Sequence, residues 1–568
     1  MNFKAVVCSV IKEKVEALYG IKLKELDKAV NICPQSTMGD YSFPCFQLVK
    51  QLGKSPDKIA EELAEIMQAE NSLSWIDRVI AVKGYVNIYL NRADYAENVL
   101  SKAVTEGFGG SDMCKGQTIC MDYSSPNIAK NFHVGHLRTT IIGNSLSKIF
   151  SKLGYSVVRI NYLGDWGTQF GNLIAAYHRL SRRELVEAEG IKELMRIYVK
   201  FEQESEKNPE LKEEGRNWFA KMEQGDEEAI SIWEWFKEIS LHEFDKVYQL
   251  LNITFDSCQG ESFYMDKVPV LAEELRQKNL LEKSEGAEIV RLEEYGLPPC
   301  LIVKNNGSSI YHSRDIAAAI HRQETYHFCK CFYITGMEQK LHFTQVFKVL
   351  EKMEYEWAEG MSHIPYGLVS MGGQKLSSRK GNIIYAEEIL QESIIRALAA
   401  IQEKSPDLEN KEEAAKKIGI GAVVYHDLAN QLIKDVQFKW EAVLNFDGMT
   451  APYIQYTFAR ANSILKKVTM AEEIIDYRVL TDDISYEVIK NLGQYPDMVA
   501  EAAEKKEPCV IARYVYHLAV SFNKFYQDCR IIGEESGVVT ARYCLTKAVA
   551  VVIEDAMALL GIECPDKM

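Results

Sequence analysis

The chain has 568 residues, of which 47% are hydrophobic and 26% are charged, and its formal net charge is −15. This apolar fraction excludes a mainly disordered protein, and a typical domain size of about 150 residues predicts three or four domains. Taken alone, the acidic balance argues against a nucleic-acid partner.

The N-terminal sequence MNFKAVVCSVIKEK lacks the long apolar stretch and small-residue cleavage site of a signal peptide. No run of about 18 apolar residues is found, so we expect no contact with a membrane. The 13 cysteines include no C-x-x-C pair, so we expect no zinc or other metal site and a reducing, cytoplasmic location. Cys329 and Cys331 are predicted to lie on one buried face of a strand.

Residues 1–112 mix helix and strand signals and predict an N-terminal α+β domain. Apolar residues at helical spacing run up to Gly20, and Ser55 with Pro56 is typical of a helix start. The stretch IDRVIAVKGYVNIYLN alternates and contains a glycine, which predicts two paired strands. The glycine-containing segment TEGFGGSD marks the end of this domain.

Residues 113–405 have the pattern of a doubly wound parallel sheet, which is a Rossmann-like α/β fold. The strand-like QTICMDYSS is followed by a helical stretch that begins at HVGH and ends at Gly154, and then by the strand-like YSVVRINYLG. Further buried strands are predicted in CLIVK, CFYITG and YGLVSM. Between them, residues 180–300 hold much of the acidic excess and predict a mainly helical insertion.

Residues 406–568 show apolar residues at helical spacing almost throughout, so they predict a C-terminal helical bundle. The fold class expected is therefore multidomain, α/β plus α.

Two short motifs could handle phosphate. HVGH (133–136) places two histidines three residues apart at a helix N-terminus, which is an anion site, and Gly135 allows close approach. MGGQKLSSRKGN (371–382) holds Lys375, Arg379 and Lys380 between glycines, as in a loop that closes over a polyphosphate. Each motif also has an ordinary interpretation, a chance tetrapeptide and a solvated basic loop.

HVGH and KLSSRKG resemble the HIGH and KMSKS signatures of class I aminoacyl-tRNA synthetases. The longer stretches around them resemble the arginyl-tRNA synthetase family at residues 124–146, 161–171, 309–320, 333–345, 363–382 and 447–465. The resemblance implies a catalytic domain, an N-terminal tRNA-binding domain and a C-terminal anticodon-binding domain. It implies a monomer that activates L-arginine with ATP and Mg²⁺ and transfers the arginine to tRNA(Arg).

The resemblance also implies roles for individual residues in ATP chemistry. Ser378 stands where the second lysine of KMSKS is expected, and Lys130 is thought to compensate for it. The catalytic residues implied are His133, His136, Lys375 and Lys130. The ATP-binding residues implied are His133, Gly135, His136, Gly336, Glu338, His342, Lys375 and Arg379.

An arginine pocket must read a planar guanidinium, for which carboxylates and amide or phenol oxygens are suited. The resemblance supplies Asp122, Ser125, Asn127, His136, Tyr311, Asp315 and Gln339. Tyr311 and Asp315 are four residues apart, so one helix start could direct both at the ligand. The alternative for Asp315 is a surface ion pair with Arg314 or Arg322.

For tRNA, the resemblance together with clustered aromatic and basic residues points to Phe43, Gln47, Tyr453, Tyr456, Arg460 and Met568. Packing is the alternative for the aromatic residues. Two other functions stay open at this point: a class I synthetase for another amino acid such as cysteine, and a non-catalytic tRNA-binding relative.

Overall fold

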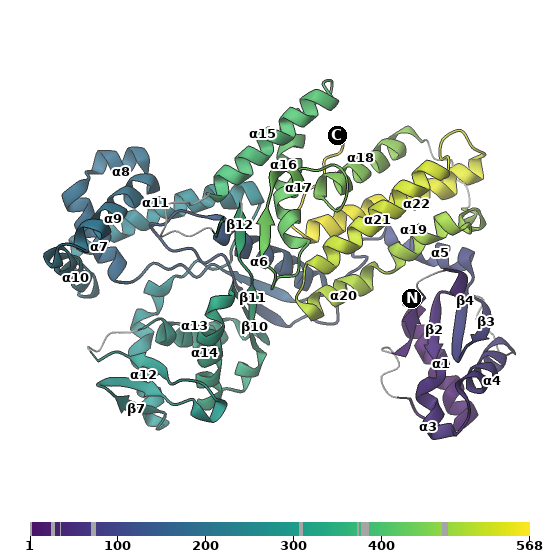
Figure 1. The fold of residues 1–568 in the computed structure, drawn as a ribbon, viewed down its shortest axis with the longest axis horizontal. Coiled ribbons are helices and arrows are strands. Elements are labelled where there is room, and N and C mark those ends of the chain that lie inside the picture. The colour runs from purple at the N-terminus through teal and green to yellow at the C-terminus, as the bar shows by residue number, and fades with distance from the viewer. Residues whose placement is uncertain are drawn as a thin grey trace. The chain divides into compact units, whose positions relative to one another are not determined.

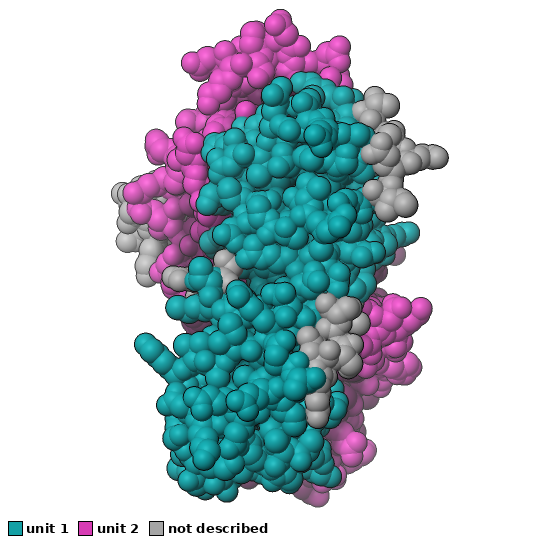
Figure 2. Space-filling model, turned by 90° about the vertical axis from the view of Figure 1, so that its right-hand side faces the viewer, with its two compact units in different colours: residues 1–108, 460–495, 517–553 teal, residues 109–459, 496–516, 554–568 magenta. Residues whose placement is uncertain are grey.

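The computed structural model describes residues 3–23, 29–33, 36–69, 75–305, 310–371, 374–375, 385–468 and 475–568. They form two compact units (Figure 2). One contains residues 1–108, 460–495 and 517–553, and the other contains residues 109–459, 496–516 and 554–568.

Four parallel strands form the sheet at the centre of the second unit. They are β5 (Thr118–Asp122), β6 (Ser156–Ile160), β10 (Lys330–Gly336) and β11 (Met361–Tyr366), in the order β11-β10-β5-β6. Helix α6 (Val134–Lys152) connects β5 to β6, and α14 (Lys340–Lys352) connects β10 to β11. The connection from β5 to β6 leads toward one edge of the sheet, and the connection from β10 to β11 leads toward the other edge. Because both crossovers are right-handed, α6 and α14 lie on opposite faces of the sheet. The predicted doubly wound sheet is confirmed, and its switch point lies between β5 and β10.

The core of this sheet is built from the apolar runs that the sequence shows. Cys120, Cys331 and Tyr333 from the strands pack with Ile316 and Val346 from the helices α13 (Tyr311–Tyr326) and α14. Cys331 is buried as predicted, but Cys329 is exposed, because β10 begins only at Lys330 and strand alternation does not extend to residue 329.

Residues 168–303 depart from the central sheet. Five helices come first: α7 (Thr168–Leu180), α8 (Arg183–Glu189), α9 (Ile191–Ser205), α10 (Pro209–Glu223) and α11 (Glu227–Leu251). Helices α7 to α10 gather in one cluster, from which α11 leads away (Figure 1). Helix α12 (Val268–Gln277) then precedes an antiparallel sheet of β7 (Leu281–Ser284), β8 (Ala287–Val290) and β9 (Cys300–Val303). The strand predicted at CLIVK is therefore confirmed, within this small sheet.

The N-terminal segment forms an antiparallel sheet in the order β1-β2-β4-β3. Its strands are β1 (Asn31–Ile32), β2 (Tyr41–Pro44), β3 (Ile76–Val82) and β4 (Tyr85–Leu90), and its helices are α1 (Phe3–Tyr19), α3 (Val49–Leu52), α4 (Pro56–Ala69) and α5 (Arg92–Ala103). The predicted pair of strands is confirmed as β3 and β4, which turn at Lys83 and Gly84 with positive φ.

A third small sheet joins the second signature motif to the segment after it. Strand β12 (Val369–Met371) pairs with β13 (Gln374–Lys375) and, in parallel, with β14 (Val436–Phe438). Around it lie α15 (Ala386–Lys404), α16 (Lys411–Leu428) and α17 (Trp440–Val443).

The rest of the chain is helical, as predicted, with α18 (Ala451–Lys467), α19 (Asp483–Gly493), α20 (Tyr495–Lys505), α21 (Cys509–Asp528) and α22 (Ser536–Leu559). Within the described ranges, α22 is the one helix long and apolar enough to cross a membrane, with a mean hydropathy of 1.4 over its most apolar window. Half of that window is buried inside the protein, as in a core helix.

Candidate active site

A cavity of about 910 Å³ opens where the strands β5 and β10 end. Asp122 is the last residue of β5, Gly336 is the last residue of β10, and the N-terminus of α6 lies between them in the lining. This is the switch point at which open α/β sheets bind their ligands. The predicted residues that line it are Asp122, Ser125, Asn127, His133, Gly135, His136, Tyr311, Asp315, Gly336, Glu338, Gln339 and His342.

The two histidines of HVGH stack on each other, with ring centroids 3.8 Å apart and planes inclined by 16°. His133 is the N-cap of α6, and its Nδ1 accepts a hydrogen bond of 3.1 Å from the Gly135 N–H. The N–H of His133 in turn donates to Nδ1 of His136 at 3.4 Å. A neutral imidazole whose Nδ1 accepts carries its proton on Nε2, so each ring retains one Nε2–H donor.

Burial keeps both rings uncharged. It lowers the pKa of His133, and it lowers the pKa of His136 well below its usual value. The positive charge of Lys130 acts on both rings in the same direction. The pair therefore offers two neutral donors at the positive end of a helix dipole, an arrangement that suits an oxyanion.

Gly135 has a role that the sequence did not reveal. A Cβ at this position would lie 2.9 Å from Cε1 of His133 and 3.0 Å from its Nδ1. The missing side chain thus makes room for the stacked imidazole. At Gly336 a Cβ would meet the carboxylate of Glu338 at 2.4 Å, so this glycine admits the Glu338 side chain beside the end of β10.

Asp122 is buried and already has a partner. Its Oδ2 lies 2.7 Å from Nη2 of Arg322, which is 1% exposed, and its Oδ1 accepts a hydrogen bond of 2.8 Å from Oγ of Ser125. The Arg322 guanidinium also stands over the rings of Tyr162 and Tyr333. Asp122 lines the cavity, but part of its charge is neutralised from within the protein.

Asp315 is oriented by a histidine. Its Oδ2 lies 2.5 Å from Nε2 of His342, and the Tyr311 ring stands 4.9 Å from the ring of His342. The surface ion pair considered for Asp315 is wrong, because Arg314 lies 3.6 Å from Glu261 and Arg322 pairs with Asp122. The predicted start of α13 at Tyr311 is confirmed, and Tyr311 and Asp315 line the same cavity.

Glu261 is a cavity residue that sequence reasoning missed. It begins the short 3₁₀ turn Glu261–Lys267, and burial raises the pKa of its carboxyl to about 7, with the charge of Asp315 acting in the same direction and Arg314 against it. An acid with a perturbed pKa in a cleft is a candidate for function. The stretch that resembles the family around residue 165 ends before it, so no motif drew attention to it.

Asp165 and Trp166 follow strand β6 and have structural partners. Asp165 is fully buried, 2.6 Å from Nζ of Lys237 on α11, and it accepts hydrogen bonds from the N–H and Oγ of Ser262. The Trp166 ring packs edge-on against Phe219 and Trp233. Both residues therefore attach the inserted helices to the sheet domain.

Of the second signature motif, only the backbone of residues 371, 374 and 375 is described. Lys375 belongs to β13, where it pairs with Ser370. Its side chain and the whole of Arg379 lie outside the described residues. Across the described ranges, no group of three or more His, Cys, Asp and Glu side chains is placed to hold a metal ion.

Of the residues predicted to contact tRNA, Phe43 is contradicted. Its ring is 0% exposed, because residues 41 and 43 of β2 both face the core, whereas Gln47 is exposed. Tyr456 is 45% exposed. The remaining three make internal contacts: Tyr453 with Tyr516, Arg460 with Asn523 and Tyr526, and Met568 with the apolar cluster of α15 and α16.

Comparison with protein families matches nearly the whole chain. Residues 97–440 match "tRNA synthetases class I (R), catalytic domain", residues 454–568 match "DALR anticodon binding domain", and residues 6–90 match "Arginyl tRNA synthetase N terminal domain". Two curated relatives are the arginine–tRNA ligases of Alkaliphilus metalliredigens and Clostridium perfringens. They are 45% and 47% identical over 570 and 573 residues, which is 100% of each chain.

The fold agrees with that assignment. The solved structure of Thermus thermophilus arginyl-tRNA synthetase superposes with a TM-score of 0.83 at 24% identity, and the match covers 100% of both chains. The switch-point cavity, the HVGH helix start and the full-length relatives lead to one conclusion: this chain belongs to the arginyl-tRNA synthetase family of class I aminoacyl-tRNA synthetases.

Proposed function

We propose that this protein is an arginine–tRNA ligase. In the first step the carboxylate of L-arginine attacks the α-phosphorus of ATP, forming arginyl-adenylate as the bond to pyrophosphate breaks. In the second step the terminal ribose hydroxyl of tRNA(Arg) takes the arginyl group and AMP leaves. The observation that carries this proposal is one cavity that holds both a pair of neutral imidazole donors and a group of carboxylates.

The carboxylates suit the guanidinium of arginine. Asp315 and Glu261 line the same cavity, and the Tyr311 hydroxyl and the Gln339 amide add further acceptors. A guanidinium has five N–H donors in a fixed plane, so several oxygen acceptors in fixed positions distinguish it from the ammonium of lysine. His342 holds the Asp315 carboxylate in place for this contact.

The imidazoles suit the phosphates. Neither step needs a protein nucleophile, so catalysis consists of positioning and of stabilising the charge that develops on phosphate oxygens. The Nε2–H groups of His133 and His136 and the N-terminus of α6 would donate to those oxygens, while Lys375 and Arg379 would add positive charge. Mg²⁺ would enter with ATP as part of the substrate.

The proposal extends to partners and domains. Residues 1–112 and 406–568 would contact tRNA(Arg), residues 113–405 would carry the chemistry, and the protein would act as a cytoplasmic monomer. Gln47 and Tyr456, which are exposed, are the tRNA contacts that we retain as first choices.

Pyrophosphate exchange tests the proposal directly. Exchange should depend on arginine and should be far weaker with lysine or cysteine, measured with and without tRNA(Arg). Exchange with cysteine but not with arginine would show a different amino-acid specificity. Absence of exchange under every condition would instead indicate a protein that binds tRNA without activating an amino acid.

A further inference from the structure

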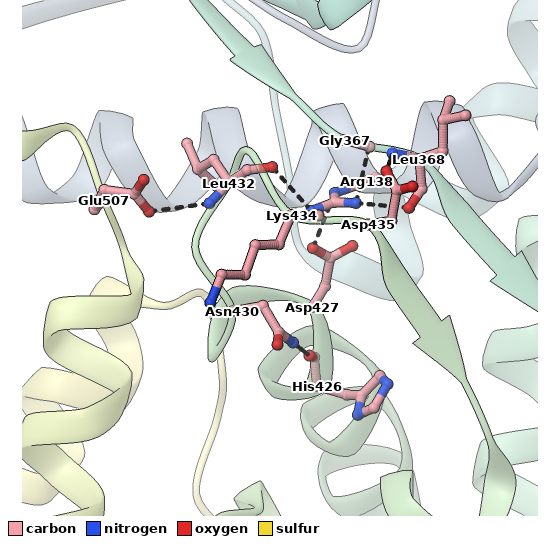
Figure 3. A network of polar contacts seen from close by, with 10 residues as sticks. All are labelled: Arg138, Gly367, Leu368, His426, Asp427, Asn430, Leu432, Lys434, Asp435 and Glu507. Carbon is pink, nitrogen blue, oxygen red and sulfur yellow. Dashed lines mark hydrogen bonds and ion pairs between the residues drawn. The ribbon is translucent and has the colours of Figure 1, made fainter.

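Arg138 is a buried cation close to the HVGH motif. It lies on α6, two residues after His136, and its side chain is 1% exposed. Figure 3 shows its guanidinium enclosed by two segments of chain that are far apart in the sequence. It donates four hydrogen bonds of 2.8–3.2 Å to main-chain oxygens, those of Gly367, Leu368, Leu432 and Lys434.

The two segments are residues 366–371, which end in β12, and residues 432–438, which end in β14. They run in parallel, and the N–H of Gly367 donates to the oxygen of Leu432 at 2.9 Å. The arginine fork bridges them at the point where the pairing starts. A Cβ at Gly367 would lie 2.7 Å from the carbonyl of Lys434, so the contact between the segments is backbone against backbone.

Two acids complete the arrangement. Asp427, at the end of α16, is half-buried, and its Oδ1 lies 3.3 Å from Nε of Arg138. Asp435 is exposed, and its Oδ1 accepts a hydrogen bond of 2.7 Å from the N–H of Leu368. Leu368 is therefore held on both sides, through its oxygen by Arg138 and through its N–H by Asp435 (Figure 3).

This arrangement joins the two signature motifs. Tyr366, Gly367, Leu368 and Val369 line the cavity, and β12 continues from them into its pairing with β13, where Ser370 lies opposite Lys375. Arg138 is thus on the helix that begins with His133 and His136. It donates hydrogen bonds to the residues just before β12, the strand that pairs with the backbone of Lys375.

We propose that Arg138 is a positioning residue for adenylate formation, which sets the distance between the imidazole pair of HVGH and the paired strands β12 and β13, in which Lys375 lies. The inference rests on the proposed function. Arg138 is among the residues that line the cavity, but it is 1% exposed and its guanidinium is occupied by main-chain oxygens and Asp427, so it acts through β12 and not on the substrates themselves. Lysine is no substitute, because an ammonium has three donors on one atom and cannot span carbonyls from two segments.

The test measures arginine-dependent pyrophosphate exchange and arginine affinity in the full-length protein. In Arg138→Lys, we expect kcat to fall about 100-fold, as for small displacements of reacting groups, and the KM for ATP to rise. The dissociation constant for arginine, measured by calorimetry, should stay within twofold, because Tyr311 and Asp315 are on α13, whereas the hydrogen bonds of Arg138 go to the segments that end in β12 and β14.

Asp435 provides a variant at an exposed position, where folding is not at risk. Asp435→Ala should lower kcat about tenfold, whereas Asp435→Asn should restore it, because the amide oxygen still accepts the Leu368 N–H. The matched control is Lys152→Met, which removes an ion pair with Asp555 at the far end of the same helix and should leave kcat unchanged.

The outcomes separate the two proposals. Wild-type protein without arginine-dependent exchange would remove the proposed function. Wild-type exchange with unchanged kcat in Arg138→Lys and Asp435→Ala would overturn the positioning role, and so would a loss of arginine affinity in step with kcat. If Arg138→Lys does not fold, the Asp435 pair decides the question.

Discussion

Glu261 is an acid placed where ionisation is unfavourable until a cation arrives. Burial raises its pKa to about 7, and Arg314, at 3.6 Å, offsets this only in part. An empty site of this kind is destabilised by its own charge, and a bound guanidinium would supply the missing partner.

We therefore predict that kcat/KM for arginine rises with pH through about 7, as free Glu261 loses its proton. In Glu261→Gln this limb should disappear, and the value above pH 8 should fall at least tenfold. Exchange assays between pH 5.5 and 9 would measure both. An unchanged profile in the variant would show that another group titrates.

Asp122 and Asp315 both line the cavity, but their partners differ. Asp122 pairs with the buried Arg322, whereas Asp315 is hydrogen-bonded to His342. Asp122→Asn should leave Arg322 buried without its anion, which lowers the free energy of unfolding by about 3–5 kcal/mol. Asp315→Asn should change stability little and should raise the KM for arginine far more than the KM for ATP. Urea unfolding and exchange kinetics measure the two effects, and equal effects of Asp315→Asn on both substrates would argue against a pocket role.

The sequence could not separate these two acids. The resemblance assigns both to the arginine pocket, but the partner of Asp122 is Arg322, 200 residues further along the chain. Asp122 ends a buried strand and lines the cavity, and the internal cation Arg322 pairs with it there. Arg138 was missed for the opposite reason, since a single arginine within a helix is ordinarily a surface residue.

At the scale of elements, α6 combines a structural and a chemical function at one residue. His133 caps the helix through Nδ1 and leaves Nε2–H for the cavity. Asparagine is a strong N-cap, so His133→Asn should preserve the helix start while removing the donor.

We expect His133→Asn to unfold in urea within about 0.5 kcal/mol of the wild type and His133→Ala to be about 1 kcal/mol less stable. Both variants should lose most of the exchange activity. If His133→Asn kept full activity, capping would be the whole contribution of this side chain.

Local elements were readable from the sequence because their signals are local. The β5–α6–β6 unit follows from apolar strands around one amphipathic helix, and the pair β3 and β4 follows from alternation around a turn. The pairing of β5 with β10 and of β12 with β14 joins residues far apart in the chain. Such pairings depend on how the side chains of distant segments pack together, so the sequence pattern of a single segment does not predict them.

At the scale of the whole molecule, the net charge of −15 pointed away from nucleic acid, yet the chain belongs to a family with an anticodon-binding domain. A sum over all residues carries no information about where the basic ones lie. Long-range structure was equally hidden: one compact unit combines residues 1–108 with parts of the C-terminal segment, where Arg92 pairs with Asp483 at 2.8 Å.

Each contact between a basic side chain and a tRNA phosphate releases counterions. The logarithm of the association constant for tRNA should therefore fall linearly with the logarithm of the salt concentration. We expect a loss of at least tenfold between 50 and 200 mM salt in filter-binding titrations. The affinity for free arginine should change less over the same range, since its carboxylate partners are partly buried and poorly screened. Equal salt slopes for the two ligands would contradict this.

The hydrogen bonds of Arg138 determine which nearby positions can accept substitutions. Its acceptors are main-chain oxygens, which every amino acid supplies, so the exposed side chains at 368 and 434 can change without weakening these hydrogen bonds. Two positions have no such freedom: residue 138, which must reach both segments, and residue 367, where any side chain would strike the carbonyl of Lys434. Among related proteins, we therefore expect Arg138 and Gly367 to be retained while the neighbouring exposed positions vary.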